Sequence, residues 1–281
     1  MLQQTKQLCK LYNIKPARSK GQNFLINEDV YDKLIEAADL TKDDTVLEVG
    51  PGLGFLTAKL AQKAKKVIAV ELDDKLAEIL RIGLKAKGIT NVEVVNENIL
   101  TSPLTPLLIR RGELKGRGYK IVANLPYNIT SIFLRQILSA EVKPSLMVLM
   151  LQKEVAERIT AKPGKMNLLA VSVQFYANSE IMRIVPADNF WPEPKVDSAI
   201  IRLTPKPPLL AKEMGSEKEF FRLMKIGFSA KRKMLKNNLA GGYHISHEDA
   251  GSKLKKAGLD IKIRAQNLSL EDWKKLFGNF T

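Results

Sequence analysis

Cysteine, histidine and long apolar runs are scarce in this sequence of 281 residues, and each shortage excludes a class of site or protein. Cys9 is the only cysteine, so the chain can form no internal disulfide and no cysteine-rich zinc site. His244 and His247 are the only histidines, and no cysteine accompanies them, so we expect no bound metal. No run approaches the ~18 apolar residues that a membrane span needs. The amino terminus lacks the apolar core of a signal peptide, and we therefore expect a cytoplasmic protein.

Acidic residues are absent from residues 1–25, which carry five Lys and Arg side chains. Residues 206–281 carry sixteen basic and eight acidic side chains, whereas residues 26–205 are nearly balanced, with 24 basic and 22 acidic. The net charge of +15 is therefore concentrated at the two ends, although a generally basic protein would spread it evenly. A nearly neutral body with basic ends is typical of a catalytic domain that carries extensions for binding a polyanion.

Short apolar runs alternate with helical patterns through most of the chain. The runs that predict strands are Thr45–Val49, Val67–Leu72, Val92–Val95, Lys120–Leu125, Leu146–Leu151, Leu168–Ala177 and Ser198–Leu203. The segments that predict helices are residues 2–12, Glu28–Ala38 with Asn27 as its N-cap, Phe55–Lys65, Asp73–Lys87 and Ser131–Ser139. Such alternation predicts an α/β fold, with a mostly parallel sheet covered by helices on both faces.

The pattern changes after the proline-rich stretch Thr204–Pro208, which we interpret as a linker. The segments beyond it are all predicted to be helical: Glu217–Lys225, Ser229–Leu239, His247–Ala257 and Leu270–Leu276. We therefore predict a large α/β domain over residues 1–206 and a small helical domain over residues 207–281. Residues 1–25 form a basic extension of the first domain, in which Lys15–Leu25 is expected to be a loop.

A glycine-rich segment, Glu48–Gly54, follows the first predicted strand and opens a helix. Its glycines allow a tight turn and a close approach of the backbone to a ligand. Glu71 lies 19 residues after Gly52, at the end of the second strand, where a carboxylate can accept both ribose hydroxyls. From these residues alone, NAD and S-adenosylmethionine are equally good candidates.

The stretch Lys120–Asn128 carries a second candidate site. Its apolar strand ends in Asn124, Leu125, Pro126 and Tyr127, at the edge where open α/β sheets place their ligands. A carboxamide, a stiffened turn and an aromatic face suit a planar amine, although Asn and Pro are also ordinary turn residues.

Taken together, these segments resemble the ribosomal RNA adenine dimethyltransferases of the small-subunit, kasugamycin-sensitivity type. The resemblance rests on Gly21–Leu25, Glu48–Gly54, Val70–Asp73, Asn124–Tyr127, Phe190–Ser198 and Gly227–Asn238, which occur in the family's order along nearly the whole chain. It implies a class I methyltransferase fold, Rossmann-like with a mostly parallel seven-stranded sheet, and S-adenosylmethionine as the cofactor. The expected reaction is the N6,N6-dimethylation of two adjacent adenosines near the 3′ end of 16S rRNA, during small-subunit biogenesis.

The resemblance also assigns residues to roles. The cofactor site is expected to contain Asn23, Leu25, Gly50, Gly52, Glu71, Leu72, Asn98, Ile99 and Asn124. The catalytic residues are expected to be Asn124, Leu125, Pro126, Tyr127 and Phe190. Position 98 departs from the family pattern, because the family usually has Asp there and this chain has Asn. The Asn98 oxygen can still accept a hydrogen bond from the adenine amine, but without charge assistance. Alternatively, Glu97 accepts that hydrogen bond. Phe190 can alternatively be a core residue, and Lys195 and Asp197 are expected to shape their loop.

Lys231, Arg232, Lys233 and Lys236 form a basic cluster near the carboxyl end. Charge runs are usually solvated helix faces, but this one lacks nearby acids and is expected to bind RNA phosphates. We expect the partner to be the small ribosomal subunit and the protein to be a monomer. Two alternatives remain: a large-subunit adenine methyltransferase of the macrolide-resistance type, and a ribosome-assembly factor without catalysis.

Overall fold

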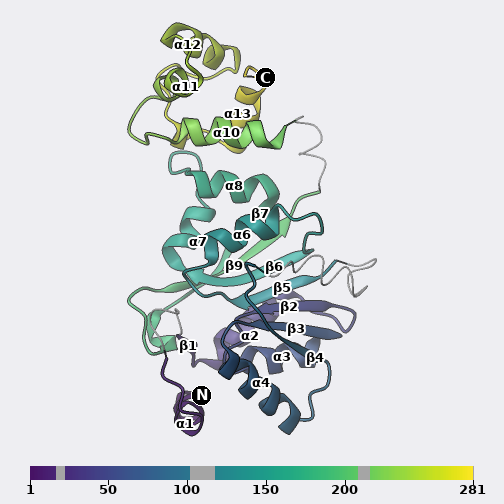
Figure 1. The fold of residues 1–281 in the computed structure, drawn as a ribbon. Coiled ribbons are helices and arrows are strands. Elements are labelled where there is room, and N and C mark those ends of the chain that lie inside the picture. Colours follow the sequence, from purple (N-terminus) through teal and green to yellow (C-terminus); the bar gives the residue numbers. More distant parts are fainter. Residues whose placement is uncertain (17–22, 102–117, 208–215, 281) are drawn as a thin grey trace. The chain divides into compact units, whose positions relative to one another are not determined.

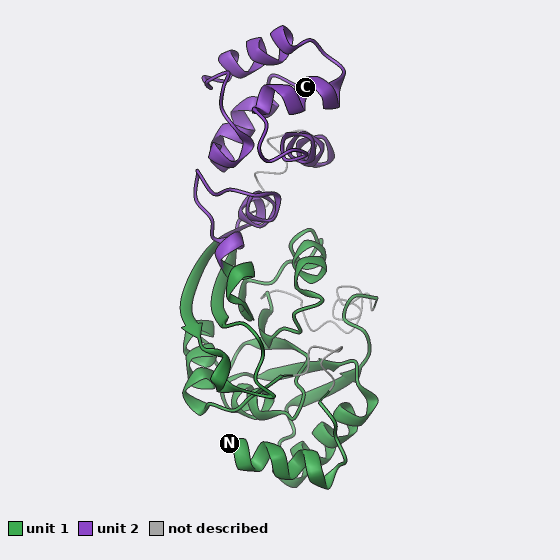
Figure 2. Ribbon diagram, turned by 90° about the vertical axis from the view of Figure 1, so that its left-hand side faces the viewer, with its two compact units in different colours: residues 1–156, 179–205 green, residues 157–178, 206–281 purple. Residues whose placement is uncertain are grey.

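The computed structural model describes residues 1–16, 23–101, 118–207 and 216–280. These residues form two compact units, one made of residues 1–156 and 179–205, the other of residues 157–178 and 206–281 (Figure 2). A single division at residue 206 therefore does not describe the chain, since a segment from its middle is grouped with the carboxyl-terminal helices. Parts of the predicted loop and linker, residues 17–22 and Pro208, lie outside the described residues.

The first unit is built on a seven-stranded sheet in the order β4-β3-β2-β5-β6-β9-β7 (Figure 1). Four neighbouring pairs, from β4 through β6, are parallel, and β9 runs antiparallel to β6. The strands are β2 (Thr45–Val49), β3 (Lys66–Glu71), β4 (Val92–Asn96), β5 (Lys120–Asn124), β6 (Leu146–Gln152), β7 (Ala177–Val185) and β9 (Ser198–Pro205). The predicted α/β fold with a mostly parallel sheet is confirmed.

Helices and a small second sheet complete this unit. The helices are α1 (Leu2–Leu11), α2 (Glu28–Ala38), α3 (Phe55–Lys63), α4 (Asp74–Ala86), α6 (Thr130–Leu138) and α7 (Lys153–Ile159), the last of which continues into the second unit. The small sheet pairs β1 (Phe24–Leu25) with β8 (Phe190–Trp191), which follows the short 3-10 helix η2 (Ala187–Asn189). The Asn27 side chain accepts from the Asp29 amide at 3.0 Å, which confirms the predicted cap of α2.

The second unit contains α8 (Leu168–Tyr176), α10 (Glu217–Gly227), α11 (Leu235–Tyr243), α12 (His247–Lys256), the 3-10 helix η3 (Ala265–Asn267) and α13 (Leu270–Phe277). Aromatic rings from three of these helices pack together, with Phe175 stacked on Phe220 at 5.1 Å and Phe277 edge-on to Phe220 at 5.5 Å between centroids. This packing explains why α8 is grouped with the carboxyl-terminal helices.

Two predicted elements are wrong. The run Leu168–Ala177 was expected to be a strand, but Leu168–Tyr176 is α8, because the Asn167 side chain caps it by accepting from the Ala170 amide at 3.1 Å. A continuous apolar run does not distinguish a buried strand from a buried helix. The helix expected from Ser229 begins only at Leu235, because the buried Asn238 amide donates to the carbonyls of Gly227 (2.6 Å) and Ala230 (3.2 Å) and holds the intervening residues in turns.

Candidate active site

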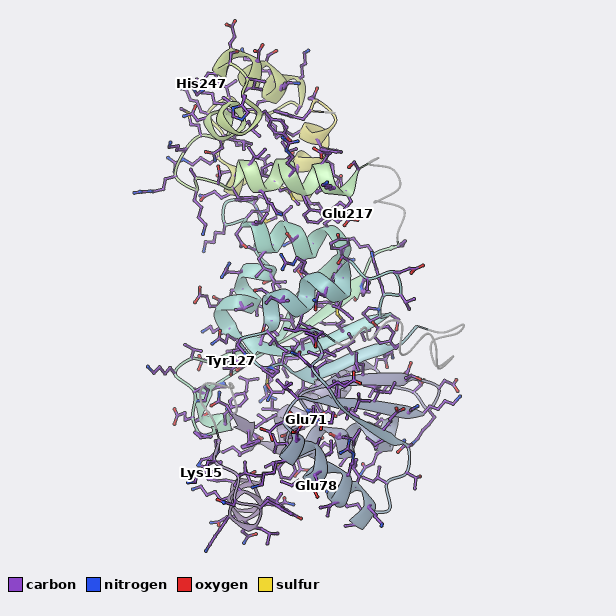
Figure 3. All side chains as sticks on the ribbon, in the orientation of Figure 1. Lys15, Glu71, Glu78, Tyr127, Glu217 and His247 are labelled. Carbon is purple, nitrogen blue, oxygen red and sulfur yellow. The ribbon has the colours of Figure 1, made fainter. Side chains whose placement is uncertain are left out.

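A cavity of about 260 Å³ lies at the carboxyl ends of β2, β3, β4 and β5. Figure 3 labels Glu71, the last residue of β3, and Tyr127, which lies in the turn after β5. The lining includes every residue predicted for the cofactor and all but one of those predicted for catalysis: Asn23, Leu25, Gly50, Gly52, Glu71, Leu72, Asn98, Ile99, Asn124, Leu125, Pro126 and Tyr127. Parallel strands point their carboxyl ends to one edge, which brings these distant segments together.

The glycine-rich turn after β2 forms one wall. Gly50 and Gly54 have φ of 68° and 79°, in the left-handed region that favours glycine. A Cβ on Gly54 would lie 2.3 Å from Leu80 Cδ1, and one on Gly50 would lie 3.4 Å from the Pro126 ring. The turn therefore needs its glycines, and it packs directly against the turn that follows β5.

Glu71 is held rigidly at the end of β3. The side chain is only 6% exposed, and its two oxygens accept from the amides of Gly52 (3.1 Å) and Asp73 (3.0 Å). Burial raises the pKa of this carboxyl, and the two backbone hydrogen bonds act in the opposite direction. Each oxygen keeps a further lone pair, so the group is an oriented pair of acceptors facing the cavity.

Glu48 also lines the cavity, and the sequence-based reasoning gave it no role. It is 1% exposed, and its Oε2 atom has no hydrogen-bond partner among the described residues. Burial, with a smaller contribution from the charge of Glu71, raises the pKa of Glu48 to about 8. The signal that could have found it is a single acid inside the otherwise apolar strand Thr45–Val49.

The wall at the end of β4 contains Asn98, whose Oδ1 atom accepts from the Leu100 amide at 2.9 Å. Glu97 lines the cavity as well, so both residues considered for the adenine amine are present there. Leu72 is 65% exposed and Ile99 is 8% exposed, and both lie on the same cavity. An exposed leucine on a cavity wall is suited to covering the face of a planar ring.

The turn after β5 forms the wall farthest from β4 in the strand order β4-β3-β2-β5. The Leu125 amide donates to the Met150 carbonyl (3.1 Å) and the Ile129 amide donates to the Pro126 carbonyl (3.2 Å), so the turn is fixed at both ends. The half-buried Asn124 side chain makes no hydrogen bond within the described part of the chain, and therefore its amide can bind a ligand. The Tyr127 hydroxyl lies 2.8 Å from Ser198 Oγ.

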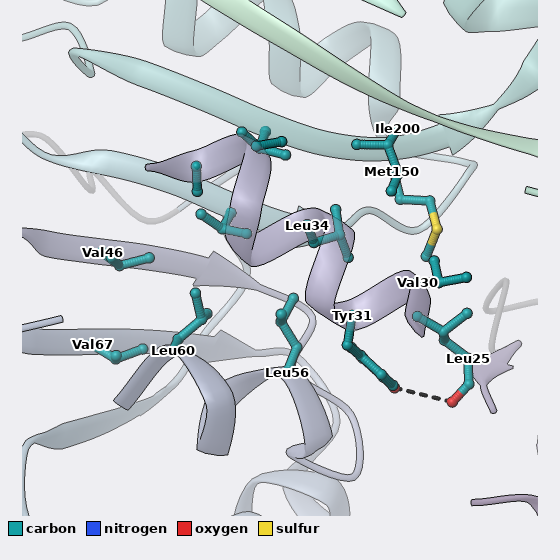
Figure 4. Close-up of a cluster of buried hydrophobic side chains, with 14 of the residues drawn as sticks. Leu25, Val30, Tyr31, Leu34, Val46, Leu56, Leu60, Val67, Met150 and Ile200 are labelled. Carbon is teal, nitrogen blue, oxygen red and sulfur yellow. Dashed lines mark hydrogen bonds between the residues drawn. The ribbon is translucent and has the colours of Figure 1, made fainter. Parts of the chain in front are cut away.

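Phe190 is the one predicted catalytic residue outside the cavity lining. It is 3% exposed and belongs to the same hydrophobic cluster as Leu25 and Tyr31, two residues that Figure 4 labels. Phe190 is paired with Leu25 across the β1–β8 sheet, and the Tyr31 hydroxyl donates to the Leu25 carbonyl at 3.0 Å. The structure thus places Phe190 beside the cofactor segment, and its stacking role stays a prediction.

The basic cluster belongs to the second unit. Lys231, Arg232 and Lys233 are exposed on the turns between α10 and α11, and Lys236 is half-buried on α11. No ion pair of these four side chains occurs within the described residues. The Asn238 side chain donates to the carbonyls of Gly227 and Ala230 and so fixes the backbone of the turns that carry the cluster.

The residues that the structure describes contain no group of three or more His, Cys, Asp and Glu side chains able to hold a metal ion. None of their helices is long and apolar enough to cross a membrane.

Comparisons with known proteins agree with the geometry. A family model described as ribosomal RNA adenine dimethylase matches residues 14–281. A "Ribosomal RNA small subunit methyltransferase A" of Dehalococcoides mccartyi (strain CBDB1) is 47% identical over 279 residues, covering 98% of this chain and 92% of the relative. The solved dimethyladenosine transferase of Plasmodium falciparum has a TM-score of 0.75 and 27% identity, covering 90% of this chain and 95% of that one. The solved 23S rRNA methyltransferase ErmE has a TM-score of 0.70 and 28% identity, covering 92% of this chain and 99% of that one.

Proposed function

The chain belongs to the ribosomal RNA adenine dimethylase family, and from this membership we propose that it dimethylates two adjacent adenosines near the 3′ end of 16S rRNA. The donor is S-adenosylmethionine, and the site of transfer is the adenine N6 amine. The observation that carries the proposal is one cavity lined both by the Glu48–Gly54 and Glu71 segments and by the Asn124–Tyr127 turn.

The residues of the cavity fit S-adenosylmethionine. The fixed Glu71 carboxylate offers two acceptors for the ribose hydroxyls, and the exposed Leu72 offers an apolar face for adenine. Gly50 and Gly52, in the turn after β2, allow close approach of the methionine portion, with Asn23 and Leu25 on the facing segment. Asn98 and Ile99 line the same cavity, and we assign them to the adenine of the cofactor. When bound, the cofactor supplies an electrophilic methyl group on a sulfonium.

Asn124 and Leu125 prepare the target amine. An adenine amine is a weak nucleophile because its lone pair is delocalised into the ring. The Asn124 side-chain oxygen and the Leu125 carbonyl can each accept one N6 hydrogen, which turns the lone pair out of the ring plane. Such positioning by preorganised groups can lower a barrier substantially without a general base or a metal.

The target base must leave its stack before it can enter the cavity. Tyr127 then offers one aromatic face, a contact worth about 1–3 kcal/mol per base. Pro126 stiffens the turn that carries this ring, and Phe190 is proposed to cover the other face of the base. For Phe190 this requires the β8 segment to turn its ring toward the cavity when RNA binds, because the ring is 3% exposed.

The second unit is proposed to be a helical RNA-binding domain. Its affinity for RNA is proposed to come from Lys231, Arg232, Lys233 and Lys236. Lys231, Arg232 and Lys233 are exposed and Lys236 is half-buried, and their cationic groups suit a phosphate backbone that is recognised by its shape. We propose a monomer that acts on the small ribosomal subunit in the cytoplasm. The full-length relative at 47% identity, which is named for the small subunit, favours that substrate over the large subunit named for ErmE.

The test is the transfer of labelled methyl groups to purified subunits that lack these modifications. The proposal expects label in the small subunit, recovered as N6,N6-dimethyladenosine at two neighbouring positions, with the large subunit unlabelled. Label in the large subunit alone would select the macrolide-resistance type. Binding to the small subunit without methyl transfer would select an assembly factor.

A further inference from the structure

The turn that carries Tyr127 is fastened to the sheet at a third point besides its two ends. The Tyr127 hydroxyl lies 2.8 Å from the hydroxyl of Ser198, the first residue of β9. Ser198 is 0% exposed and is paired with Gln152 at the carboxyl end of β6. The partner of the phenol is therefore a buried group on a paired strand of the sheet.

The residue before Ser198 is fixed as well. The backbone carbonyl of Asp197 accepts from the Lys153 amide at 2.9 Å, and the side-chain Oδ1 atom of Asp197 accepts from the Ala187 amide at 3.2 Å. These contacts tie the start of β9 to the end of β6 and close the loop that contains Phe190. Ser198 is consequently fixed in position, so the hydrogen bond constrains the Tyr127 hydroxyl rather than Ser198.

Among the described residues, the Tyr127 side chain makes no second hydrogen bond and no contact with another aromatic ring. It is half-buried on the cavity wall, and the backbone contacts of its turn are made by Leu125 and Ile129 rather than by its own side chain. Burial raises the pKa of Tyr127, so its hydroxyl is protonated at neutral pH and can donate to Ser198. One hydrogen bond at the far end of the ring defines the direction in which the ring points.

We infer that Ser198 is a positioning residue, which sets the plane of the Tyr127 ring and through it the placement of the target adenine against Asn124. This inference rests on the proposed methyl transfer. A base stacked on a misplaced ring keeps its contact area but loses the alignment of its amine with the two acceptors. Because reaction rates depend on alignment more steeply than binding does, loss of the contact should slow transfer without weakening RNA binding.

The test is a double-mutant cycle on the full-length protein with undermethylated small subunits. Ser198→Ala and Tyr127→Phe each remove one partner and keep the ring and the volume nearly unchanged. Each should slow single-turnover methylation by about 3- to 10-fold at saturating RNA, as expected for one neutral hydrogen bond. RNA affinity should stay within about twofold of the wild type.

The double variant decides the matter. If the two hydroxyls act as a pair, it should be no slower than the slower single variant. Tyr119→Phe is a matched control, because Tyr119 comes directly before β5 whereas Tyr127 comes after it. Tyr119 is 1% exposed, and its hydroxyl contacts the Val142 carbonyl at 3.5 Å. This control should methylate at the wild-type rate.

Two results would overturn the inference while the wild type is active: single variants at the wild-type rate, or single effects that multiply in the double variant. A rate loss matched by an equal loss of RNA affinity would also overturn it, since Ser198 would then serve binding alone. A wild-type protein that transfers no methyl group would instead overturn the proposed function, and the inference with it.

Discussion

At the scale of single residues, the Glu71 carboxylate is held firmly by its surroundings, because both of its oxygens accept from backbone amides. Glu71→Ala should weaken S-adenosylmethionine binding by roughly 1.5–3 kcal/mol, because the ribose hydroxyls lose charged acceptors. Glu71→Gln, which keeps one acceptor and the side-chain size, should lose less. Calorimetry that finds wild-type affinity for both variants would remove Glu71 from the cofactor site.

Asn98 lines the cavity at the end of β4 and is proposed to contact the adenine amine. Its Oδ1 atom already accepts from the Leu100 amide, so the side chain offers the adenine amine only a shared oxygen. Asn98→Asp adds a second, charged acceptor, and we expect cofactor binding to tighten or stay level. A marked loss of affinity in the same titration would show that position 98 does not face the adenine.

Glu48 gives the fold a pH dependence of predictable sign. Its pKa rises from an ordinary 4.5 to about 8 on folding, so between these values the folded chain binds more protons than the unfolded chain. Its stabilising contribution is therefore complete below about pH 4.5 and is lost as the pH rises through 8. Over this range, the wild-type free energy of unfolding should fall by up to about 1.4 kcal/mol per pH unit relative to Glu48→Gln.

Urea denaturation of the cofactor-free protein between pH 5 and pH 8 checks this difference in slope. Parallel pH profiles for the wild type and Glu48→Gln would show that Glu48 is ionised throughout and that its burial in the cavity does not control its charge.

At the scale of elements, the turns between α10 and α11 present the basic cluster. Replacing Lys231, Arg232 and Lys233 with Ala should weaken RNA binding, and each lost phosphate contact should reduce the log–log salt slope by about 0.7–0.9. Free cofactor binding should not change.

The matched control replaces Lys63, Lys85 and Lys87, which are exposed in the first unit, and so removes the same charge. If filter binding gives both triple variants the same salt slope, the cluster contributes only general charge.

Several elements could be predicted because local pattern and tertiary role agree. Thr45–Val49 is apolar, short and followed by glycine, and it forms β2 with the predicted bounds. Two elements could not be predicted. The run Leu168–Tyr176 is helical because of packing within the second unit and the Asn167 cap, and the late start of α11 depends on contacts that Asn238 makes with residues up to eleven positions away. Neither cause is visible in a local window of sequence.

At the scale of the whole molecule, the candidate site could be predicted as far as topology determines it. Strands that are parallel neighbours end at one edge, so segments as distant as Glu71 and Asn124 were expected to meet there. The contact of Ser198 with Tyr127 could not be predicted, because it joins residues 71 positions apart. The grouping of residues 157–178 with the carboxyl-terminal helices was likewise not visible in the pattern of the chain.

The central claim is that the turn after β5 activates an adenosine of the small subunit, and single-turnover methylation by Asn124→Ala tests it most directly. Removing one preorganised polar group should slow transfer to undermethylated small subunits by roughly 10²–10³-fold. RNA affinity, measured by filter binding, should hardly change, because we assign most of it to the basic cluster. Methylation by Asn124→Ala at the wild-type rate would contradict the account.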